Sequence, residues 1–222
     1  MDLMEARGGS WEISMSQRMP VVFVVDDDIS VRESLAALIR HEGWEPEVFD
    51  SAQAFLKREP SSVPSCVILD VNLPGLNGLD LQERIGPDRA GMPIIFLTGY
   101  GDVPMSVRAM KAGAAEFLTK PFDDEVLLGA IRSAIERSEE VLAREAEMLA
   151  LRERFESLSK REREVMTLIV RGLLNKQVGG ELGISEITVK AHRGKVMEKM
   201  KARSFAELVN MGTGLGMRTA GL

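Results

Sequence analysis

Five polar side chains follow apolar runs of the sequence at positions where predicted strands end. They are three acids, a hydroxyl and an amine, in chain order Asp26, Asp27, Asp70, Thr98 and Lys120. The carboxyl ends of strands in an open α/β sheet form one edge, where ligands bind, so these residues would meet there. The acidic run at 26–28 alone could equally be an acidic turn. The presence of polar side chains at the ends of four predicted strands favours a functional site at that edge of the sheet.

The chemistry that such a cluster supports is phosphoryl transfer around a metal ion. Clustered carboxylates need a cation, and hard oxygen ligands with room for water suit Mg²⁺. A carboxylate can attack phosphorus to give an aspartyl phosphate, which requires little beyond positioning and charge neutralisation. An aspartate-nucleophile phosphohydrolase is the alternative. Those enzymes carry a DxD arrangement after the first strand, whereas Asp70 ends the third.

The elements that must position these side chains are five strand–helix pairs. We expect strands at 21–25, 45–49, 66–69, 93–97 and 115–119, and helices at 30–41, 52–56, 79–85, 103–112 and from 123 onward. The first run, Val21–Val25, is wholly apolar and mostly β-branched, which is typical of a strand buried on both faces of a parallel sheet. Five such pairs predict an α/β fold with helices on both faces of the sheet.

The fifth helix is expected to continue past this fold, because residues 123–155 hold no proline and one glycine. Leu128, Ile135, Leu142 and Leu149 recur every seven residues, although the intervening positions are only partly apolar. This imperfect heptad favours a signalling helix that pairs with its copy in a dimer. The alternative is one amphipathic helix packed on its own domain.

The remaining sequence predicts only helices. Ser159 and Glu162 form a capping-box pattern for a helix that stops at Gly172. Further helices are expected at 175–182, capped by Asn175 and ended by Gly183, at 186–200, capped by Ser185, and at 204–210. Gly212, Gly214 and Gly216 predict a frayed end.

Charge separates the two parts of the chain. Residues 21–122 carry 9 basic and 15 acidic residues, a net charge of −6, whereas residues 155–222 carry 12 and 7, a net charge of +5. A basic C-terminal part predicts contact with a polyanion there, the alternative being a solvated basic surface. RNA binding or protein docking is the rival to DNA binding, and the helical spacing argues against it.

Composition excludes several classes of protein. The 222 residues contain no apolar run of about 18 residues, so no membrane contact is expected. Residues 1–20 lack the apolar core of a secretory signal, and the one cysteine, Cys66, cannot form an intrachain disulfide. We therefore expect a cytoplasmic protein with a disordered tail at 1–19, in which Met15 and Met19 are alternative starts.

Four blocks of the sequence resemble a known family. VVDDD at 24–28, LDVNLPGLNG at 69–78 and FLTGYGDVPMSVRAMKAGAAEFLTKPF at 96–122 resemble a response-regulator receiver. LSKREREVMTLIVRGLLNKQVGGELGISEITVKAHRGKVMEKM at 158–200 resembles the LuxR-type helix-turn-helix. Together they resemble the NarL/FixJ class of two-component response regulators, most of all its FixJ type. The resemblance implies a flavodoxin-like (βα)5 receiver with a parallel sheet, followed by an all-α, four-helix DNA-binding domain.

The resemblance assigns roles to the strand-end residues. Asp70 would accept phosphate from a sensor histidine kinase. Mg²⁺ would bind Asp27, Asp70 and the main-chain carbonyl of Asn72, with Asp26 acting mainly through water. Lys120 and Thr98 would contact phosphoryl oxygens. The remaining features that it implies are an aromatic switch at Phe117 and a cis peptide between Lys120 and Pro121.

The resemblance also assigns the DNA-reading positions to the helix at 186–200. Lys190, Ala191 and Gly194 match the base-reading positions of the family. Because Gly194 has no side chain, we expect Arg193 or Lys195 to compensate. Helical spacing by itself places Val189, Val196 and Met200 in a buried stripe. Thr188 and His192 lie near the edge of that stripe, where we expect phosphate contacts, and Lys199 adds positive charge.

Two features of this region have a second interpretation. His192 could be a packed ring satisfied by the backbone. Gly179 and Gly180 depart from the alanine that the family has near there, and each helical glycine costs about 0.5–1 kcal/mol relative to alanine.

We therefore expect a tail at 1–19, a receiver at 20–136, a helical linker at 137–156 and a DNA-binding domain at 157–222. The expected function is a phosphorylation-controlled transcription factor, activating rather than repressing, whose only chemistry is its own Mg²⁺-dependent phosphotransfer and dephosphorylation. The expected partners are the kinase, double-stranded promoter DNA, RNA polymerase and, upon phosphorylation, a second copy of the chain.

Overall fold

The computed structural model describes residues 19–85, 91–99 and 103–217, and the expected disordered tail lies, apart from Met19, outside them. The chain divides into two compact units, Met1–Ala143 and Arg144–Leu222. Along the described parts of the chain, no helix is long and apolar enough to cross a membrane.

The first unit is built on a parallel sheet in the order β2-β1-β3-β4-β5. Its strands are β1 (Val21–Val25), β2 (Glu45–Phe49), β3 (Ser65–Asp70), β4 (Ile94–Thr98) and β5 (Glu116–Thr119). Every residue of β3 and β4 is buried, because these central strands are covered on both faces. The expected strands are therefore present, with ends that differ by at most one residue.

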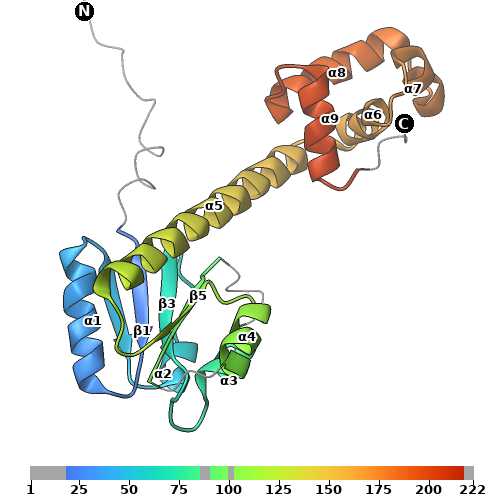
Figure 1. Cartoon of the computed structure of the whole chain (residues 1–222). Helices are drawn as coiled ribbons and strands as arrows, with labels where there is room; N and C mark the ends of the chain where they lie inside the picture. The colour runs from blue at the N-terminus through green and yellow to red at the C-terminus, as the bar shows by residue number, and fades with distance from the viewer. Residues whose placement is uncertain (1–18, 86–90, 100–102, 218–222) are drawn as a thin grey trace, which may run out of the picture. The chain divides into compact units, whose positions relative to one another are not determined.

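Helices cover both faces of the sheet (Figure 1). They are α1 (Ile29–His41), α2 (Ala52–Leu56), α3 (Gly78–Arg84), α4 (Val103–Lys111) and α5 (Asp124–Glu156). Phe23 and Val25 of β1 face one buried cluster with α2 and α3, whereas Val22 and Val24 face another with α1 and α5. The α/β fold expected from the sequence is confirmed.

Helix α5 runs unbroken for 33 residues, as the lack of proline predicts. Leu128 and Ile135 are both 5% exposed and pack on the receiver sheet, whereas Leu149 is 59% exposed. The Ser138 hydroxyl, buried in α5, accepts a hydrogen bond of 3.0 Å from the backbone N–H of Ser65. The predicted heptad is therefore not one continuous seam, since its first two positions already have partners. Pairing of the later turns stays a prediction.

Among its described residues, the second unit has four helices after α5, which are α6 (Lys160–Val170), α7 (Asn175–Leu182), α8 (Glu186–Met200) and α9 (Phe205–Gly214). The capping box at the start of α6 is present, because Ser159 Oγ accepts from the Glu162 N–H while Glu162 accepts from the Ser159 N–H. Ser185 caps α8, and Gly183 ends α7 in the left-handed conformation, at φ +66°.

Two expectations for this unit are wrong. Asn175 does not cap α7. Leu174 occupies the cap position, where its N–H donates to Gln177 Oε1 at 2.8 Å, and Asn175 is the first helical residue. Helix α9 also does not fray at Asn210 but continues to Gly214. Gly212 is buried, and a Cβ there would lie 2.8 Å from Val170 Cγ1, so this glycine allows close packing of α9 on α6.

Candidate functional site

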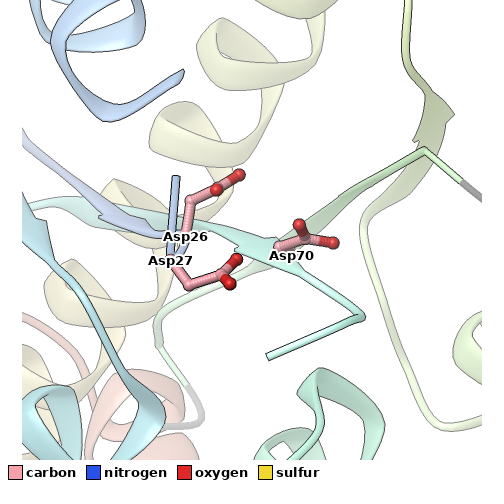
Figure 2. Close-up of side chains that lie close together, drawn as sticks. All are labelled: Asp26, Asp27 and Asp70. Carbon is pink, nitrogen blue, oxygen red and sulfur yellow. The ribbon is translucent and has the colours of Figure 1, made fainter. Parts of the chain in front are cut away.

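The register of the sheet brings three of the strand-end acids together. Strands β1 and β3 are neighbours with Val25 opposite Leu69, so Asp26 and Asp70 emerge side by side. Asp27 follows Asp26, and each of the three acids offers a carboxylate oxygen within 4.8 Å of the others. Figure 2 shows the three side chains close together. Asp26 and Asp70 are buried and Asp27 is exposed, so solvent can reach one side of the cluster.

Lys120 brings positive charge to this cluster from the end of β5. Its Nζ lies 2.6 Å from Asp26 Oδ2 and 3.2 Å from Asp70 Oδ2. Burial alone would lower the pKa of Lys120, but the hydrogen bond and charge of Asp26, with the charge of Asp70, raise it above its ordinary value. Burial also raises the pKa of Asp26, an effect that its contacts with Lys120 and the Asp28 N–H partly offset. In this structure the Lys120 ammonium group therefore contacts two of the three acids.

Local backbone structure fixes the directions of the acids. Asp26 Oδ1 accepts from the N–H of Asp28 at 2.9 Å, and the carboxylate of Asp28 caps α1 by accepting from the Ser30 N–H. Asp70 Oδ1 accepts from the N–H of Asn72 at 3.1 Å. Short side-chain-to-backbone contacts of this kind hold the carboxylates without using the oxygen atoms that face one another.

Thr98 and Asn72 complete the edge of the site. Thr98 is fully buried at the end of β4, and its Oγ1 accepts a hydrogen bond of 3.4 Å from Asn72 Nδ2. Phe117 is half-buried on β5, with its ring centroid 6.0 Å from that of Phe96. The Lys120–Pro121 peptide is cis, as expected. All the strand-end residues selected from the sequence therefore border one site.

The sequence analysis assigned no role to Gly78, which the site requires. A Cβ at Gly78 would lie 2.4 Å from the carbonyl oxygen of Asp70, and the Gly78 N–H donates to the carbonyl of Val71 at 2.9 Å. The backbone between β3 and α3 therefore folds back so that Gly78 lies directly against the backbone of Asp70. Gly78 directly precedes the helix predicted at 79–85, where glycine is an ordinary residue, so its type gave no signal of this contact.

The donor set fits a hard divalent cation. Three carboxylates converge, one of them is exposed, and a main-chain carbonyl follows at Asn72, which is the mixture of oxygen ligands and open positions that Mg²⁺ takes. A cation there would also relieve the repulsion between Asp70 and its acidic neighbours.

The second candidate site is the outer face of α8. Val189, Val196 and Met200 are fully buried, which confirms the predicted stripe. On the other side, Ile187 is 80% exposed, and the Lys190 side chain is 62% exposed beside Glu186, with Nζ and Oε1 separated by 3.2 Å. The remaining exposed positions expected to contact DNA are Thr188, Ala191, Gly194 and Lys195.

Two of the cations expected on this face are engaged within the protein. Arg193 donates to Asn175 Oδ1 at 3.3 Å, and its guanidinium lies 4.9 Å from the ring centroid of Phe205. Lys199 Nζ lies 2.7 Å from Glu162 Oε2 and also donates to the carbonyl of Ser157. Both contacts stabilise the unit itself, and the sequence alone did not reveal them.

The structure bears on three further residues of this unit, His192, Gly179 and Gly180. His192 is half-buried, and its Nδ1 has no hydrogen-bond partner among the residues described, so the backbone does not satisfy that nitrogen. A Cβ at Gly179 would lie 2.7 Å from the carbonyl oxygen of Ile184, so the turn between α7 and α8 requires this glycine. Gly180 has open space around it and no such reason.

The fold and these two sites define a receiver-type domain joined to a helix-turn-helix domain, and comparisons with known proteins agree. A family model described as response regulator receiver domain matches residues 22–132, and one described as bacterial regulatory proteins, luxR family, matches residues 156–212. The chain belongs to the FixJ-type family of response regulators, which combine these two domains. It is a transcriptional response regulator and not a classical enzyme, so the phosphohydrolase alternative is set aside.

Individual relatives match over nearly the whole chain. Nodulation protein W of Bradyrhizobium diazoefficiens is 49% identical over 211 residues, which cover 95% of this chain and 92% of that protein. Transcriptional regulatory protein FixJ of the same organism is 43% identical, over 88% of this chain and 96% of that protein. Among solved structures, the response regulator StyR has 48% identity and a TM-score of 0.78, covering 88% of this chain and 99% of that chain. Full-length FixJ from B. japonicum has 41% identity and a TM-score of 0.51, covering 90% and 98%.

Proposed function

We propose that Asp70 accepts a phosphoryl group from the phosphohistidine of a sensor kinase, and that this modification controls promoter binding by α8. The observation that carries the proposal is the convergence of Asp26, Asp27, Asp70 and Lys120 from three strand ends. In the transfer, a carboxylate oxygen of Asp70 bonds to phosphorus as the phosphorus–nitrogen bond of the phosphohistidine breaks. The histidine nitrogen keeps the electron pair.

Asp27, Asp70 and the main-chain carbonyl of Asn72 would hold Mg²⁺, with Asp26 contributing mainly through water. When bound, the cation neutralises charge on the transferring phosphoryl group. The protein itself positions the acceptor, because the Asn72 N–H fixes one oxygen of Asp70 while the other faces Lys120. When the acyl phosphate is hydrolysed, water is the acceptor: its oxygen bonds to phosphorus, the bond between phosphorus and the Asp70 oxygen breaks, and Asp70 is released as a carboxylate.

Phosphorylation changes what Lys120 and Thr98 bind. The new group adds about −1.5 to −2 charge and strong acceptor oxygens beside existing carboxylates. Lys120 exchanges its contact with the Asp70 carboxylate for a phosphoryl oxygen, and the Thr98 hydroxyl turns from Asn72 to donate to another. Lys120 follows β5, and Thr98 lies opposite Thr119 of β5, which packs on α4, so these elements and Phe117 shift together.

The shifted face then pairs with the same face of a second copy. Support comes from α4, whose outward side exposes Val103, Val107 and Met110 at 75%, 44% and 46%. A dimer presents two copies of α8 to double-stranded promoter DNA, where Lys190, Ala191, Lys195 and the phosphate-contacting Thr188 and His192 bind. Transcription is activated, with RNA polymerase as the further partner.

We also propose the division into a receiver at 20–136, a linker at 137–156 and a DNA-binding domain at 157–222. The buried contact of Ser138 with Ser65 shows that packing on the receiver extends two residues into that linker.

The test is to map the modification. Purified protein is incubated with acetyl phosphate and Mg²⁺, trapped with borohydride or hydroxylamine, and analysed by peptide mass spectrometry. We expect modification at Asp70, its loss in Asp70→Asn, and none without Mg²⁺. Asp50→Asn is the matched control, because Asp50 also follows a strand of the sheet but lies outside the acid cluster, and it should be modified normally. Modification of another residue, or none, contradicts the proposal.

A further inference from the structure

The side chain of Ile187 is the most unusual feature of the DNA-reading helix. Its exposed fraction of 80% is larger than that of the other large apolar residues exposed in the described chain. Ile187 lies in the first turn of α8, opposite the buried Val189 and Val196. Helical geometry places Lys190, Ala191 and Gly194 on the same face, three, four and seven residues later. An isoleucine held in water on this face gains nothing from the packing of its own domain.

Gly194 is a second feature that the packing of the protein does not explain. It lies inside α8, where glycine is unfavourable relative to alanine, yet a Cβ there would meet nothing within 4 Å. Gly179 differs, because a Cβ at that position would collide with the Ile184 carbonyl. Close approach of the backbone to a ligand is one of the roles that glycine has in proteins.

Of the two cations expected to compensate for Gly194, Lys195 is exposed and Arg193 is engaged within the protein. Arg193 is held by Asn175 and the ring of Phe205, so it does not take over the role of the missing side chain at Gly194. Lys190 remains at the surface beside Glu186. The centre of the exposed face of α8 therefore consists of the Ile187 side chain, the Ala191 methyl group and the backbone at Gly194. The surrounding residues 155–222 have a net charge of +5.

We propose that Ile187 is a specificity-determining residue that packs on the C5-methyl group of thymine in the major groove, with Gly194 allowing α8 to approach the bases. The inference rests on the proposed promoter binding by α8 and names what that helix reads. Thymine alone presents a methyl group in the major groove, and apolar side chains recognise it by contact. Burial of one methyl group corresponds to about fourfold in affinity.

The test begins with the full chain, activated by beryllium fluoride and Mg²⁺, selecting duplexes from a random pool. Each thymine of the selected site is then replaced by deoxyuridine, which removes only the methyl group. We expect the wild type to lose about fourfold in affinity at one or two thymines. Ile187→Ala should bind the thymine site more weakly and be indifferent to uracil at those positions, whereas Ile187→Val should retain the discrimination. Ile187→Ala remains folded, because the side chain is exposed and alanine favours helix.

Equal losses on uracil substitution in the wild type and Ile187→Ala at every thymine would overturn the inference. Failure of the wild type to select any sequence would instead overturn promoter reading by α8, and the inference with it. The two failures are therefore distinguishable.

Gly194→Ala gives an independent readout, and Gly180→Ala in α7 is its matched control. Both glycines are exposed, helical and surrounded by open space, so both variants should raise the melting temperature of the second unit. Only Gly194→Ala should weaken binding to the selected duplex, by about tenfold if α8 approaches the bases closely. Equal affinities for the two variants would show that the backbone at Gly194 does not approach the DNA.

Discussion

The ammonium group of Lys120 lies 2.6 Å from Asp26 Oδ2 although the two residues are 94 positions apart in the chain. The Asp26 side chain is 4% exposed and that of Lys120 22%. A buried carboxylate that loses its cation is left uncompensated, and this costs more than the intact pair contributes. The pair is therefore a structural element of the resting receiver as well as part of its site.

Replacing Lys120 by Met should destabilise the receiver by about 2 kcal/mol, less than for a fully buried pair because the lysine is partly exposed. Urea unfolding followed by the fluorescence of Trp44, which packs on the receiver core, measures this loss. Mg²⁺ should restore part of it, since a cation again neutralises the acids. Unchanged stability in the absence of Mg²⁺ would contradict the assignment.

Gly78→Ala should destabilise the receiver by about 1–3 kcal/mol and lower the rate of Asp70 phosphorylation, because the new Cβ meets the backbone of Asp70 at 2.4 Å. Gly129→Ala in α5, where a Cβ meets nothing within 4 Å, is the control. It should stabilise the receiver by about 0.5–1 kcal/mol. The same urea titration distinguishes them, and equal effects would show that the loop at Gly78 relaxes freely.

Glu162 should make the second unit sensitive to acid. The hydrogen bond from Lys199, followed by that from the Ser159 N–H, lowers the pKa of Glu162 from 4.5 to about 2. A lowered pKa in the folded state means that the stabilisation is fully present above pH 4.5 and is lost as the pH falls towards 2.

Glu162→Gln should therefore cost about 1–2 kcal/mol at pH 7, and the difference from wild type should vanish near pH 2. Helical circular dichroism during urea unfolding reports both units, whereas tryptophan fluorescence reports only residues 1–143, because both tryptophans, Trp11 and Trp44, lie there. A difference that persists at pH 2 would assign the loss to packing instead of charge.

Dimerisation should depend on α4. Val107→Glu places a charge on the exposed side of this helix and should weaken the phosphorylated dimer by at least about tenfold in dissociation constant. Val48→Glu is the control, since Val48 is 45% exposed against 44% for Val107 but lies on β2, at the opposite edge of the sheet from β5. Sedimentation equilibrium with beryllium fluoride measures both. Equal weakening, or none in Val107→Glu, would place the interface elsewhere.

The sequence was informative where periodicity and strand ends determine the structure. The apolar run before Asp26 and the one that ends in Asp70 specified two buried strands, and the expectation that their ends share one edge followed from the topology of parallel sheets. That the two strands are neighbours was learned from the structure. The buried side of α8 likewise followed from helical spacing. The buried strands and the buried side of α8 depend on the local spacing of apolar residues, which a single sequence contains.

Contacts between distant segments were not predictable in this way. The engagement of Arg193 by Phe205, and the close approaches at Gly78 and Gly212, depend on how separate elements pack. The cap of α7 was also misassigned, because Asn175 is a favourable cap by type, yet the side chain of Gln177 satisfies the N–H of Leu174 instead. The preference of asparagine for cap positions was therefore outweighed by the hydrogen bond from the Leu174 N–H to Gln177 Oε1.

The most direct test of the account is the affinity of the full chain for its selected duplex, measured by fluorescence anisotropy with and without acetyl phosphate and Mg²⁺. We expect phosphorylation to tighten binding by at least about tenfold in the wild type and in Asp50→Asn, and to have no effect in Asp70→Asn. An equal response in Asp70→Asn, or no response in a wild-type sample shown by mass to be phosphorylated, would contradict control of DNA binding by Asp70.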